Sequence, residues 1–370
     1  MRSGFVTILG RPNAGKSTLL NALTGEKVSI VTAKPQTTRN RIAGVVEVPA
    51  RKGQHPAAQI VFVDTPGVHK PGSHLDRRML QEVYEALETR DLVLVLIDAT
   101  RKLKFLDKPE GAGQEARTRA ALEPGAATGA SFETPPKARS SEQRAARGPW
   151  ASEDEFLFSL VRKLDCPVFL VVTKIDLVRK DELLPLIDTL SLRFAFAEVI
   201  PISARKRDGL DLLMRKIVDV LPEGQRYYPQ DQYTDQPLRF MVAELIRESI
   251  LIETGEEVPY ASAVVIEVFE EPAAEAKRPL TRIAAAIYCE RDGQKAILIG
   301  KGGSKLRDIG TGARRKIEAL LGTRVYLELR IIVEPGWRES KVFVQQLDWH
   351  NQLEKLAGEQ VDESEPEEDE

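Results

Sequence analysis

The chain has few cysteines and no long apolar run. Only two cysteines occur among its 370 residues, Cys166 and Cys289. They stand far apart without a CxxC pair or metal-ligand spacing, which fits a reducing cytosol and two small buried side chains. The longest apolar runs, such as LVLVLI at residues 92–97, are of strand length. A membrane-spanning helix needs roughly 20 apolar residues, so no segment is expected to cross a membrane.

No secretion signal is expected at the amino terminus. Its first residues, MRSGFVTILG, lead directly into a strand-like pattern. They include neither an extended apolar region nor a small-residue cleavage site. We therefore expect the protein to stay in the cytoplasm.

Charge is distributed unevenly along the chain, although the formal net charge is only −3. Residues 291–341 contain twelve Lys or Arg against six Asp or Glu. Residues 362–370 (DESEPEEDE) carry seven acids and no base, a composition that cannot fold alone. The segregation predicts an anionic partner for the basic stretch.

Strand and helix patterns alternate through the first 220 residues, as in a parallel sheet covered on both faces. The expected strands are 5–10, 42–48, 59–64, 92–98, 167–173 and 198–201. The expected helices are 16–23, 75–89, 153–164, 181–194 and 210–220. This order predicts a doubly wound α/β domain.

Two segments interrupt these patterns. Residues 107–149 are rich in Gly, Ala, Pro, Ser, Arg and Glu and contain almost no large apolar residue, so we interpret them as a long surface loop. The second segment, residues 221–237, is rich in Pro, Gln and Asp, and the helical periodicity stops there. The expected organisation is a first domain at 1–221, a linker at 222–237, a second domain at 238–345 and a C-terminal extension at 346–370.

The strongest chemical motif is GRPNAGKS at residues 10–17, which matches GxxxxGK[ST] between an expected strand and an expected helix. Its glycines let successive backbone N–H groups face a phosphate at the helix N-terminus. Lys16 adds a positive charge at the β- and γ-phosphates, and the Ser17 hydroxyl can bind Mg²⁺. A chance glycine turn is the alternative, which the strand and helix context disfavours.

The nucleotide base is expected to be guanine. Asp176, in the sequence TKID after a strand, can accept paired hydrogen bonds from guanine N1–H and its amino group. Lys174 can lie along the base, and Thr173 can brace the loop through a hydrogen bond. Ser203 and Ala204 follow the next strand, where a backbone N–H can reach guanine O6. A solvated Lys-x-Asp turn is the alternative for this motif alone.

Two further loops complete the expected phosphate site. The sequence DTPG at residues 64–67 follows a strand, so Asp64 can hold Mg²⁺ through water and the Gly67 N–H can contact the γ-phosphate. Either Thr37 or Thr38 can complete the metal shell, and we favour Thr38. Position 68 is valine, so the water-orienting glutamine of many Ras-like GTPases is missing and slow intrinsic hydrolysis is expected.

The second domain has a different pattern. It predicts a helix at 238–253, strands at 261–269 and 281–290, and a helix at 305–320 before the strand RVYLELRIIV. Gly300, Lys301, Gly302 and Gly303 form a GxxG loop before the last helix. Such a loop lets the backbone of single-stranded nucleic acid approach closely, with bases in an adjacent apolar groove. The nearby charges would come from Lys301, Lys305 and Arg307. A plain glycine turn is the alternative.

These motifs together resemble one family, the Era GTPases of bacteria. The residues that carry the resemblance are GRPNAGKSTLLNAL, KPQTTRNRI, DTPGVHKP, TKIDL, SA, RFMVAELIRESIL, EEVPY and IGKGGSKLRDIG. The resemblance covers nearly the whole chain apart from the 107–149 insert and the extreme C-terminus. Ala14 stands where many relatives have valine, a small packing change.

The resemblance implies a Ras-like P-loop G domain followed by an α+β type II KH domain. It implies GTP hydrolysis, with GTP or GDP and Mg²⁺ bound, and binding of small-subunit ribosomal RNA near the 3′ end of 16S rRNA during assembly. Asn13 matches an asparagine that helps to coordinate K⁺ in related GTPases. The expected protein is monomeric, with weak peripheral membrane association as a further option. The implied nucleotide-binding residues are Gly10, Asn13, Ala14, Gly15, Lys16, Ser17, Thr18, Asp64, Thr65, Pro66, Gly67, Thr173, Lys174, Asp176, Ser203 and Ala204.

Two other function classes remain open from the residues alone. A P-loop kinase for a small molecule would share GxxxxGKS, but it has no need of TKID, DTPG and SA in this order. An RNA-binding protein with an inactive nucleotide site would keep the second domain, but Lys16, Ser17 and Asp64 are all present. A comparison of GTP binding with ATP binding separates these classes.

Overall fold

The computed structural model describes residues 1–53, 55–69, 71–101, 152–255, 258–272, 278–347 and 349. The chain divides into two compact units. Unit 1 comprises Met1–Ser29, Arg41–Lys70 and Leu80–Thr234, and unit 2 comprises Ile30–Asn40, Pro71–Met79 and Asp235–Glu370. The expected loop at 107–149 and the acidic tail lie outside the described residues, and the expected domain boundaries stay predictions.

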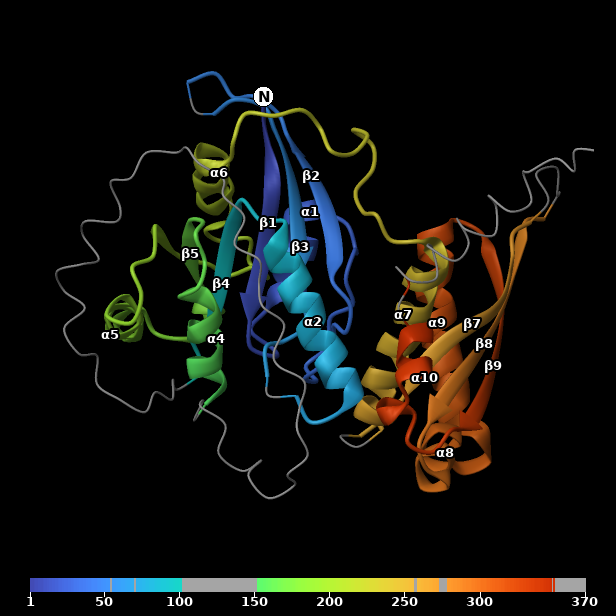
Figure 1. Ribbon diagram of the computed structural model, residues 1–370. Helices are drawn as coiled ribbons and strands as arrows, with labels where there is room; N and C mark the ends of the chain where they lie inside the picture. The colour runs from blue at the N-terminus through green and yellow to red at the C-terminus, as the bar shows by residue number, and fades with distance from the viewer. Residues whose placement is uncertain are drawn as a thin grey trace, which may run out of the picture. The chain divides into compact units, whose positions relative to one another are not determined.

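Unit 1 is built on a six-stranded sheet with the order β2-β3-β1-β4-β5-β6 (Figure 1). The strands are β1 (Arg2–Gly10), β2 (Ile42–Val48), β3 (Ala58–Asp64), β4 (Leu92–Asp98), β5 (Val168–Thr173) and β6 (Glu198–Pro201). Only β2 runs antiparallel to its neighbour. β3, β4 and β5 are mostly apolar and are buried along their whole length, as expected for strands covered on both faces.

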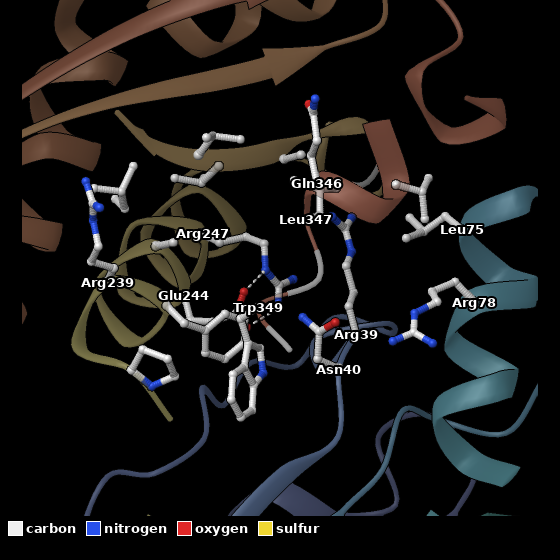
Figure 2. Close-up of a pocket in the computed structure, with 18 residues that line it drawn as sticks. Arg39, Asn40, Leu75, Arg78, Arg239, Glu244, Arg247, Gln346, Leu347 and Trp349 are labelled. Atoms are coloured by element: carbon white, nitrogen blue, oxygen red, sulfur yellow. Dashed lines mark hydrogen bonds and ion pairs between the residues drawn. The ribbon is translucent and has the colours of Figure 1, made fainter. Parts of the chain in front are cut away.

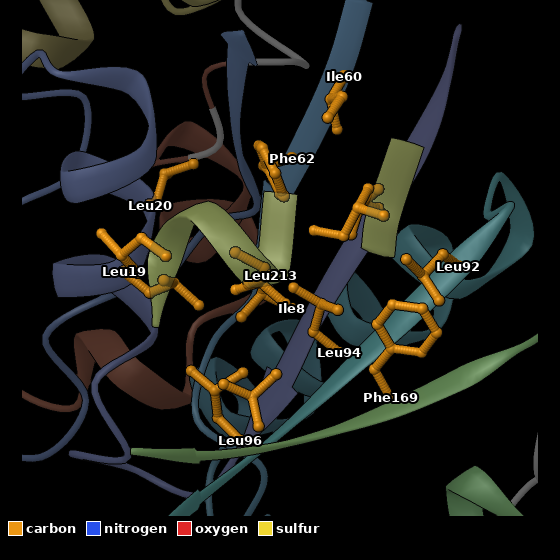
Figure 3. Packing of buried hydrophobic residues seen from close by; sticks show 14 of the residues in the cluster. Ile8, Leu19, Leu20, Ile60, Phe62, Leu92, Leu94, Leu96, Phe169 and Leu213 are labelled. Carbon is orange, nitrogen blue, oxygen red and sulfur yellow. The ribbon is translucent and has the colours of Figure 1, made fainter. Parts of the chain in front are cut away.

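Helices cover both faces of this sheet because successive strand residues point to opposite sides. The helices are α1 (Lys16–Thr24), α2 (His74–Glu88), α4 (Glu153–Val161), α5 (Lys180–Ser191) and α6 (Leu210–Val220). On one face Leu94 and Leu96 of β4 pack in a cluster with Leu19 of α1 and Leu213 of α6 (Figure 3). On the other, Val93 and Val95 pack with residues of α2 and α4. The expected doubly wound α/β arrangement is confirmed.

Residues 222–234, most of the expected linker, pair with the strands of unit 1. The Ser3 N–H donates to the carbonyl of Pro222 at 3.1 Å. The ring of Tyr227 packs against Phe5 at 4.7 Å between centroids. Thr234 bridges to Gly44 of β2. The chain therefore leaves unit 1 at Thr234, well after the end of α6.

Unit 2 contains a three-stranded sheet of order β7-β8-β9, namely Ala263–Glu270, Leu280–Cys289 and Arg324–Val333. β7 and β8 are antiparallel, and β8 and β9 are parallel. The accompanying helices are α7 (Leu238–Glu253), α8 (Asp292–Ile299), α9 (Ser304–Leu321) and α10 (Lys341–Gln346). Ile246, Ile287 and Ile317 meet in the core between α7, α9 and the sheet. α8 was not predicted.

Two details of the expectations are settled by burial. Cys289 is buried as predicted, but Cys166 is half-exposed because it precedes β5 rather than lying within the sheet. Across the ranges that the structure describes, no helix is both long and apolar enough to span a membrane.

Candidate functional site

The phosphate loop of unit 1 joins the end of β1 to the start of α1. Asn13 and Gly15 adopt left-handed backbone angles, with φ of 63° and 92°, which curl the chain so that α1 begins at Lys16. The Lys16 ammonium donates to the carbonyls of Gly10 and Arg11, at 3.1 and 3.0 Å. Burial lowers the pKa of Lys16 to about 8, although the Asp64 carboxylate raises it. The lysine is thus held within the loop.

The residues expected to hold Mg²⁺ meet in part. The Ser17 hydroxyl donates to Asp64 Oδ2 at 2.7 Å, and Ser29 donates to the same oxygen at 3.3 Å. Hydroxyl and carboxylate oxygens are the ligands that Mg²⁺ prefers, so this pair fits the ion. Thr38 is buried within unit 2. The structure therefore joins Ser17 and Asp64, and the place of the threonine in the metal shell stays a prediction.

The DTPG loop packs against the phosphate loop through its glycine. A Cβ atom on Gly67 would lie 2.7 to 2.8 Å from atoms of Pro12, a distance that real side chains do not tolerate. The Thr65 hydroxyl donates to the Ile8 carbonyl at 2.8 Å, and the Val68 N–H donates to the Gly10 carbonyl at 3.1 Å. Pro66 is also buried. Only glycine allows the two loops to come this close.

The expected base-binding motifs follow β5 and β6 at the same edge of the sheet. The Thr173 hydroxyl donates to the carbonyl of Ala14 at 2.8 Å, so this side chain ties the end of β5 to the phosphate loop. Asp176 lies half-buried in a single 3₁₀ turn, Ile175–Leu177. The Ile175 N–H donates to the Ile202 carbonyl at 3.3 Å, so the TKID loop is tied to the segment before Ser203 and Ala204.

Sequence reasoning missed Asp98, which ends β4. Its carboxylate accepts from Lys174 Nζ at 2.6 Å and from the Thr100 hydroxyl at 2.7 Å. Burial alone raises the pKa of Asp98, but the hydrogen bonds from Lys174 and Thr100 outweigh it and lower the pKa. The carboxylate therefore holds the Lys174 ammonium beside the end of β4. The sequence did contain a signal for this residue, because an aspartate ends the otherwise apolar strand LVLVLID.

The GxxG loop of unit 2 lies between α8 and α9. Gly302 and Gly303 have φ of 60° and 77°, and a Cβ on either would meet no atom within 4 Å. Gly300 differs, because its Cβ would lie 2.6 Å from the Cβ of Lys305. Lys301 and Arg307 are exposed, and the Lys305 ammonium lies 3.5 Å from the Glu253 carboxylate. The loop is thus open to solvent and bordered by cations.

A groove with both apolar and cationic lining adjoins this loop. It encloses about 400 Å³ next to Gly303. Its lining combines the apolar side chains of α9 and β9 with two arginines: Leu306, Leu327, Leu329, Arg307 and Arg314. Arg314 lies two turns along α9 from Arg307 and was not predicted. The groove places apolar surface for bases beside cations for phosphates.

Comparisons with known proteins identify relatives of both units of the chain. A family model for "50S ribosome-binding GTPase" matches residues 5–120, and one for "KH domain" matches residues 257–338. The protein "GTPase Era" of Heliobacterium modesticaldum is 41% identical over 92% of this chain and 94% of its own. "GTPase Era" of Ruminiclostridium cellulolyticum is 37% identical over the same shares.

Solved structures give the same result. A crystal structure of Era with MgGDPNP and nucleotides 1506–1542 of 16S ribosomal RNA has a TM-score of 0.76 and 35% identity, covering 94% of this chain and 99% of that one. A variant of Aquifex aeolicus Era bound to GDP.AlF4⁻ gives a TM-score of 0.75, 35% identity and the same coverage. The expected fold class, a Ras-like P-loop G domain followed by a type II KH domain, is confirmed.

Proposed function

Because this chain belongs to the Era family of GTPases, we propose that it binds and hydrolyses GTP in unit 1 and binds RNA through the KH domain in unit 2. The RNA is that of the small ribosomal subunit, near the 3′ end of 16S rRNA, and the activity assists assembly of that subunit. One observation carries the GTPase assignment. The hydroxyl of Thr173, from the base motif, donates to Ala14 of the phosphate loop, so both halves of a nucleotide site meet at one sheet edge.

The phosphate half of the site acts through backbone donors and one cation. The N–H groups of residues 13–18 face the α- and β-phosphates at the start of α1, where the helix dipole favours anions. When GTP binds, the Lys16 ammonium replaces its hydrogen bonds to two loop carbonyls with contacts to the β- and γ-phosphates. Mg²⁺, held by Ser17, Asp64 and Thr38, would neutralise phosphate charge. The Gly67 N–H donates to the γ-phosphate.

The base half of the site selects guanine. Asp176 accepts from guanine N1–H and the exocyclic amine, which adenine cannot reproduce. Lys174, held by Asp98, lies along the face of the base. The backbone N–H groups of Ser203 and Ala204 donate to guanine O6.

Hydrolysis proceeds slowly in the free protein. The side chain of Val68 is 1% exposed and packs in the core under α2, so nothing at this position orients the attacking water. Asn13 in the phosphate loop would hold K⁺, and the ion would supply positive charge to offset the charge that develops on the phosphates. Turnover at equal ionic strength should then be faster in KCl than in NaCl, and Asn13→Ala should remove the difference.

RNA is held at the GxxG loop and the adjoining groove. The open φ > 0 glycines at 302 and 303 let the sugar-phosphate backbone approach, while Lys301, Lys305 and Arg307 neutralise its phosphates. Leu306, Leu327 and Leu329 form the apolar floor on which bases lie. A cytoplasmic location, a monomeric state and weak attachment to the cytoplasmic face of the membrane stay predictions.

The test measures both activities in one protein. The full chain is assayed for GTP hydrolysis with Mg²⁺ and for binding of a single-stranded 16S rRNA 3′ fragment. Lys16→Ala should lower GTP affinity or turnover at least tenfold, about 1.4 kcal/mol, while RNA binding is unchanged. An unchanged rate of GTP hydrolysis in Lys16→Ala would contradict the phosphate assignment. A lack of binding between the wild-type protein and the RNA fragment would contradict the RNA assignment.

A further inference from the structure

Two carboxylates of this protein accept hydrogen bonds from different kinds of donor. At the pocket drawn in Figure 2, Glu244 accepts from Nε and Nη2 of Arg247, at 2.7 and 2.6 Å, on its own helix α7. Asp64, which ends β3, is 0% exposed and accepts from the hydroxyls of Ser17 and Ser29. A hydroxyl is a neutral donor, so it orients a carboxylate without cancelling its charge. The geometry at Asp64 therefore suits an acid that acts on a cation.

The charge of Asp64 does act on its surroundings. It raises the pKa of Lys16, against the larger lowering that burial causes. The Ser17 hydroxyl lies at 2.7 Å from Oδ2, and the Ser29 hydroxyl lies at 3.3 Å from the same oxygen. Two donors on one oxygen fix the plane of the carboxylate, because both act on the same side of it. Hydrogen bonds to a charged acceptor are also stronger than those between neutral groups.

Ser29 is itself held firmly, in the loop that follows α1. Its side chain is 1% exposed. The side-chain oxygen of Asn21, on α1, accepts from the N–H groups of Val28 and Ser29, at 3.0 and 2.9 Å. The side-chain nitrogen of Asn21 donates to the Ser29 carbonyl at 2.7 Å. One amide thus binds this short segment through three hydrogen bonds, and it sets the place of the Ser29 hydroxyl from α1.

The two hydroxyls at Asp64 differ in what else they do. Ser17 is expected to bind Mg²⁺ with its own oxygen, so its position depends on the metal. Ser29 is not one of the expected ligands, and its hold on Asp64 depends on Asn21 instead. Groups that orient a metal ligand from behind in this way typically contribute about 10- to 100-fold to metal affinity.

We propose that Ser29 is a positioning residue for the metal of the nucleotide site. Its hydroxyl, set by Asn21, fixes Asp64 in the orientation that binds Mg²⁺ through water. This inference rests on the GTP site proposed above. Neither Ser29 nor Asn21 belongs to the residues expected to contact GTP, so the role predicts an effect on metal binding and none on the nucleotide alone.

The test uses the full chain with bound GDP and Mn²⁺ as the probe, since Mn²⁺ takes the same octahedral oxygen coordination as Mg²⁺. The free ion is measured by its electron paramagnetic resonance signal. Ser29→Ala should weaken Mn²⁺ binding about tenfold. The affinity for GDP in EDTA should be unchanged, whereas a merely structural role of Ser29 would lower that affinity as well.

Two further variants make the test specific. Ser159→Ala removes another buried hydroxyl of unit 1, which donates to the Phe156 carbonyl at 2.6 Å within α4, and it should leave Mn²⁺ binding unchanged. Asn21→Ala removes the amide that sets Ser29, so it should weaken Mn²⁺ binding too. Because Asn21 acts through Ser29, the double variant should bind Mn²⁺ no more weakly than Ser29→Ala alone, whereas independent effects would multiply.

The possible results separate this inference from the proposed function. The inference is overturned if Ser29→Ala binds Mn²⁺ as tightly as wild type, if Ser159→Ala loses as much affinity, or if the effects of Asn21→Ala and Ser29→Ala multiply. Each of these results leaves the proposed function intact when wild type binds GDP. A wild-type protein that binds neither GDP nor GTP overturns the proposed function, and this inference with it.

Discussion

The two glycine-rich turns of this protein, before α1 and before α9, are built in different ways. The turn before α1 is closed, since Gly67 packs directly on Pro12 and Lys16 is 6% exposed. The turn before α9 is open, since Gly302 and Gly303 face empty space and Lys301 is exposed. A closed turn suits one phosphate chain held at many points. An open turn suits a polymer that passes across it.

The difference also determines how each site is supported. The closed turn is braced from other strands, by Thr173 of β5 and by the DTPG loop after β3. The open turn is braced mainly by its own helix, where Gly300 packs on Lys305. Changes around the first turn should therefore act through pre-formed geometry, and changes at the second through local charge and shape.

The largest expected effect tests whether the closed site reads its base through one carboxylate. Wild type should prefer GTP to ATP by roughly 10⁴-fold, because a carboxylate facing adenine loses its hydrogen bonds. Asp176→Asn should shift the preference toward xanthosine triphosphate, measured by competition binding. Asp181→Asn, on an exposed residue of α5, is the control and should keep the GTP preference. Equal binding of GTP and ATP by wild type would remove the guanine assignment.

The next largest expected effect is a change of stability with pH. It tests whether the turn before α1 keeps the Lys16 ammonium away from water. In the folded state the pKa of Lys16 is about 8, against an ordinary value of 10.5. Below pH 8 the lysine is charged in both states and its burial penalty is fully present. Between pH 8 and 10.5 the unfolded chain binds more protons, so stability rises with pH.

The expected gain from this lysine is on the order of 3 kcal/mol in the nucleotide-free protein. Urea unfolding near neutral pH and at higher pH gives the free energy of unfolding of wild type and of Lys16→Met, whose side chain cannot titrate. The gain is the extra rise with pH in wild type. Lys301→Met, in the open turn, is the matched control and should follow wild type. Identical pH curves for wild type and Lys16→Met would mean that the lysine is not desolvated.

The sequence predicted the elements around the closed turn well because their signals are local. In unit 1 the helix Leu210–Val220 and the strand Ile42–Val48 have the expected boundaries, and in unit 2 the helix Leu238–Glu253 does too. Strands that are apolar on both sides are typical of a sheet covered on both faces, so their pattern predicts their position in the fold. GxxxxGKS and TKID lie at strand ends, and the carboxyl ends of parallel strands share one edge.

What the sequence did not predict depends on contacts between distant residues. Asp98 acquires a role only because β4 lies beside β5, which brings Lys174 within 2.6 Å. α8 is short and contains Gly293, which hides its periodicity. The 30–40 segment joins unit 2 because Ile30 enters its core and Arg39 bonds to Ser262, neither of which has a local signal.

A third prediction breaks the open turn. Lys301→Asp combined with Gly302→Asp adds two carboxylates and a Cβ at a φ of 60°, so charge and backbone strain act together against RNA. Binding of a single-stranded 16S rRNA 3′ fragment should fall at least about tenfold, and wild-type binding should weaken as salt rises. Filter binding measures both.

The control for the open turn is Gly322→Asp, at the end of α9. Gly322 has a φ of 67° and equally open surroundings, so the substitution adds the same strain and one carboxylate away from the GxxG loop. RNA binding should stay within about twofold in this variant, and GTP hydrolysis should survive in both. Unchanged affinity in the double variant would mean that RNA is held elsewhere on the chain, with the basic residues of the 107–149 segment as the next candidates.

The smallest expected effect concerns the hydrogen bond from Thr173 of β5 to the phosphate loop, a brace that the open turn lacks. Thr173→Val keeps the shape of a side chain that is 3% exposed but removes its hydrogen bond to Ala14. The free energy of unfolding should fall by about 1 kcal/mol, and GTP affinity should fall severalfold because the phosphate loop loses its support from β5. Thr189→Val removes a hydroxyl that donates to Pro185 on exposed α5 at the same 2.8 Å, and it should change neither quantity by much, since water replaces that bond. If both variants lose GTP affinity equally, the brace from β5 does not shape the phosphate loop, and the closed turn would hold its form, like the open one, from local packing alone.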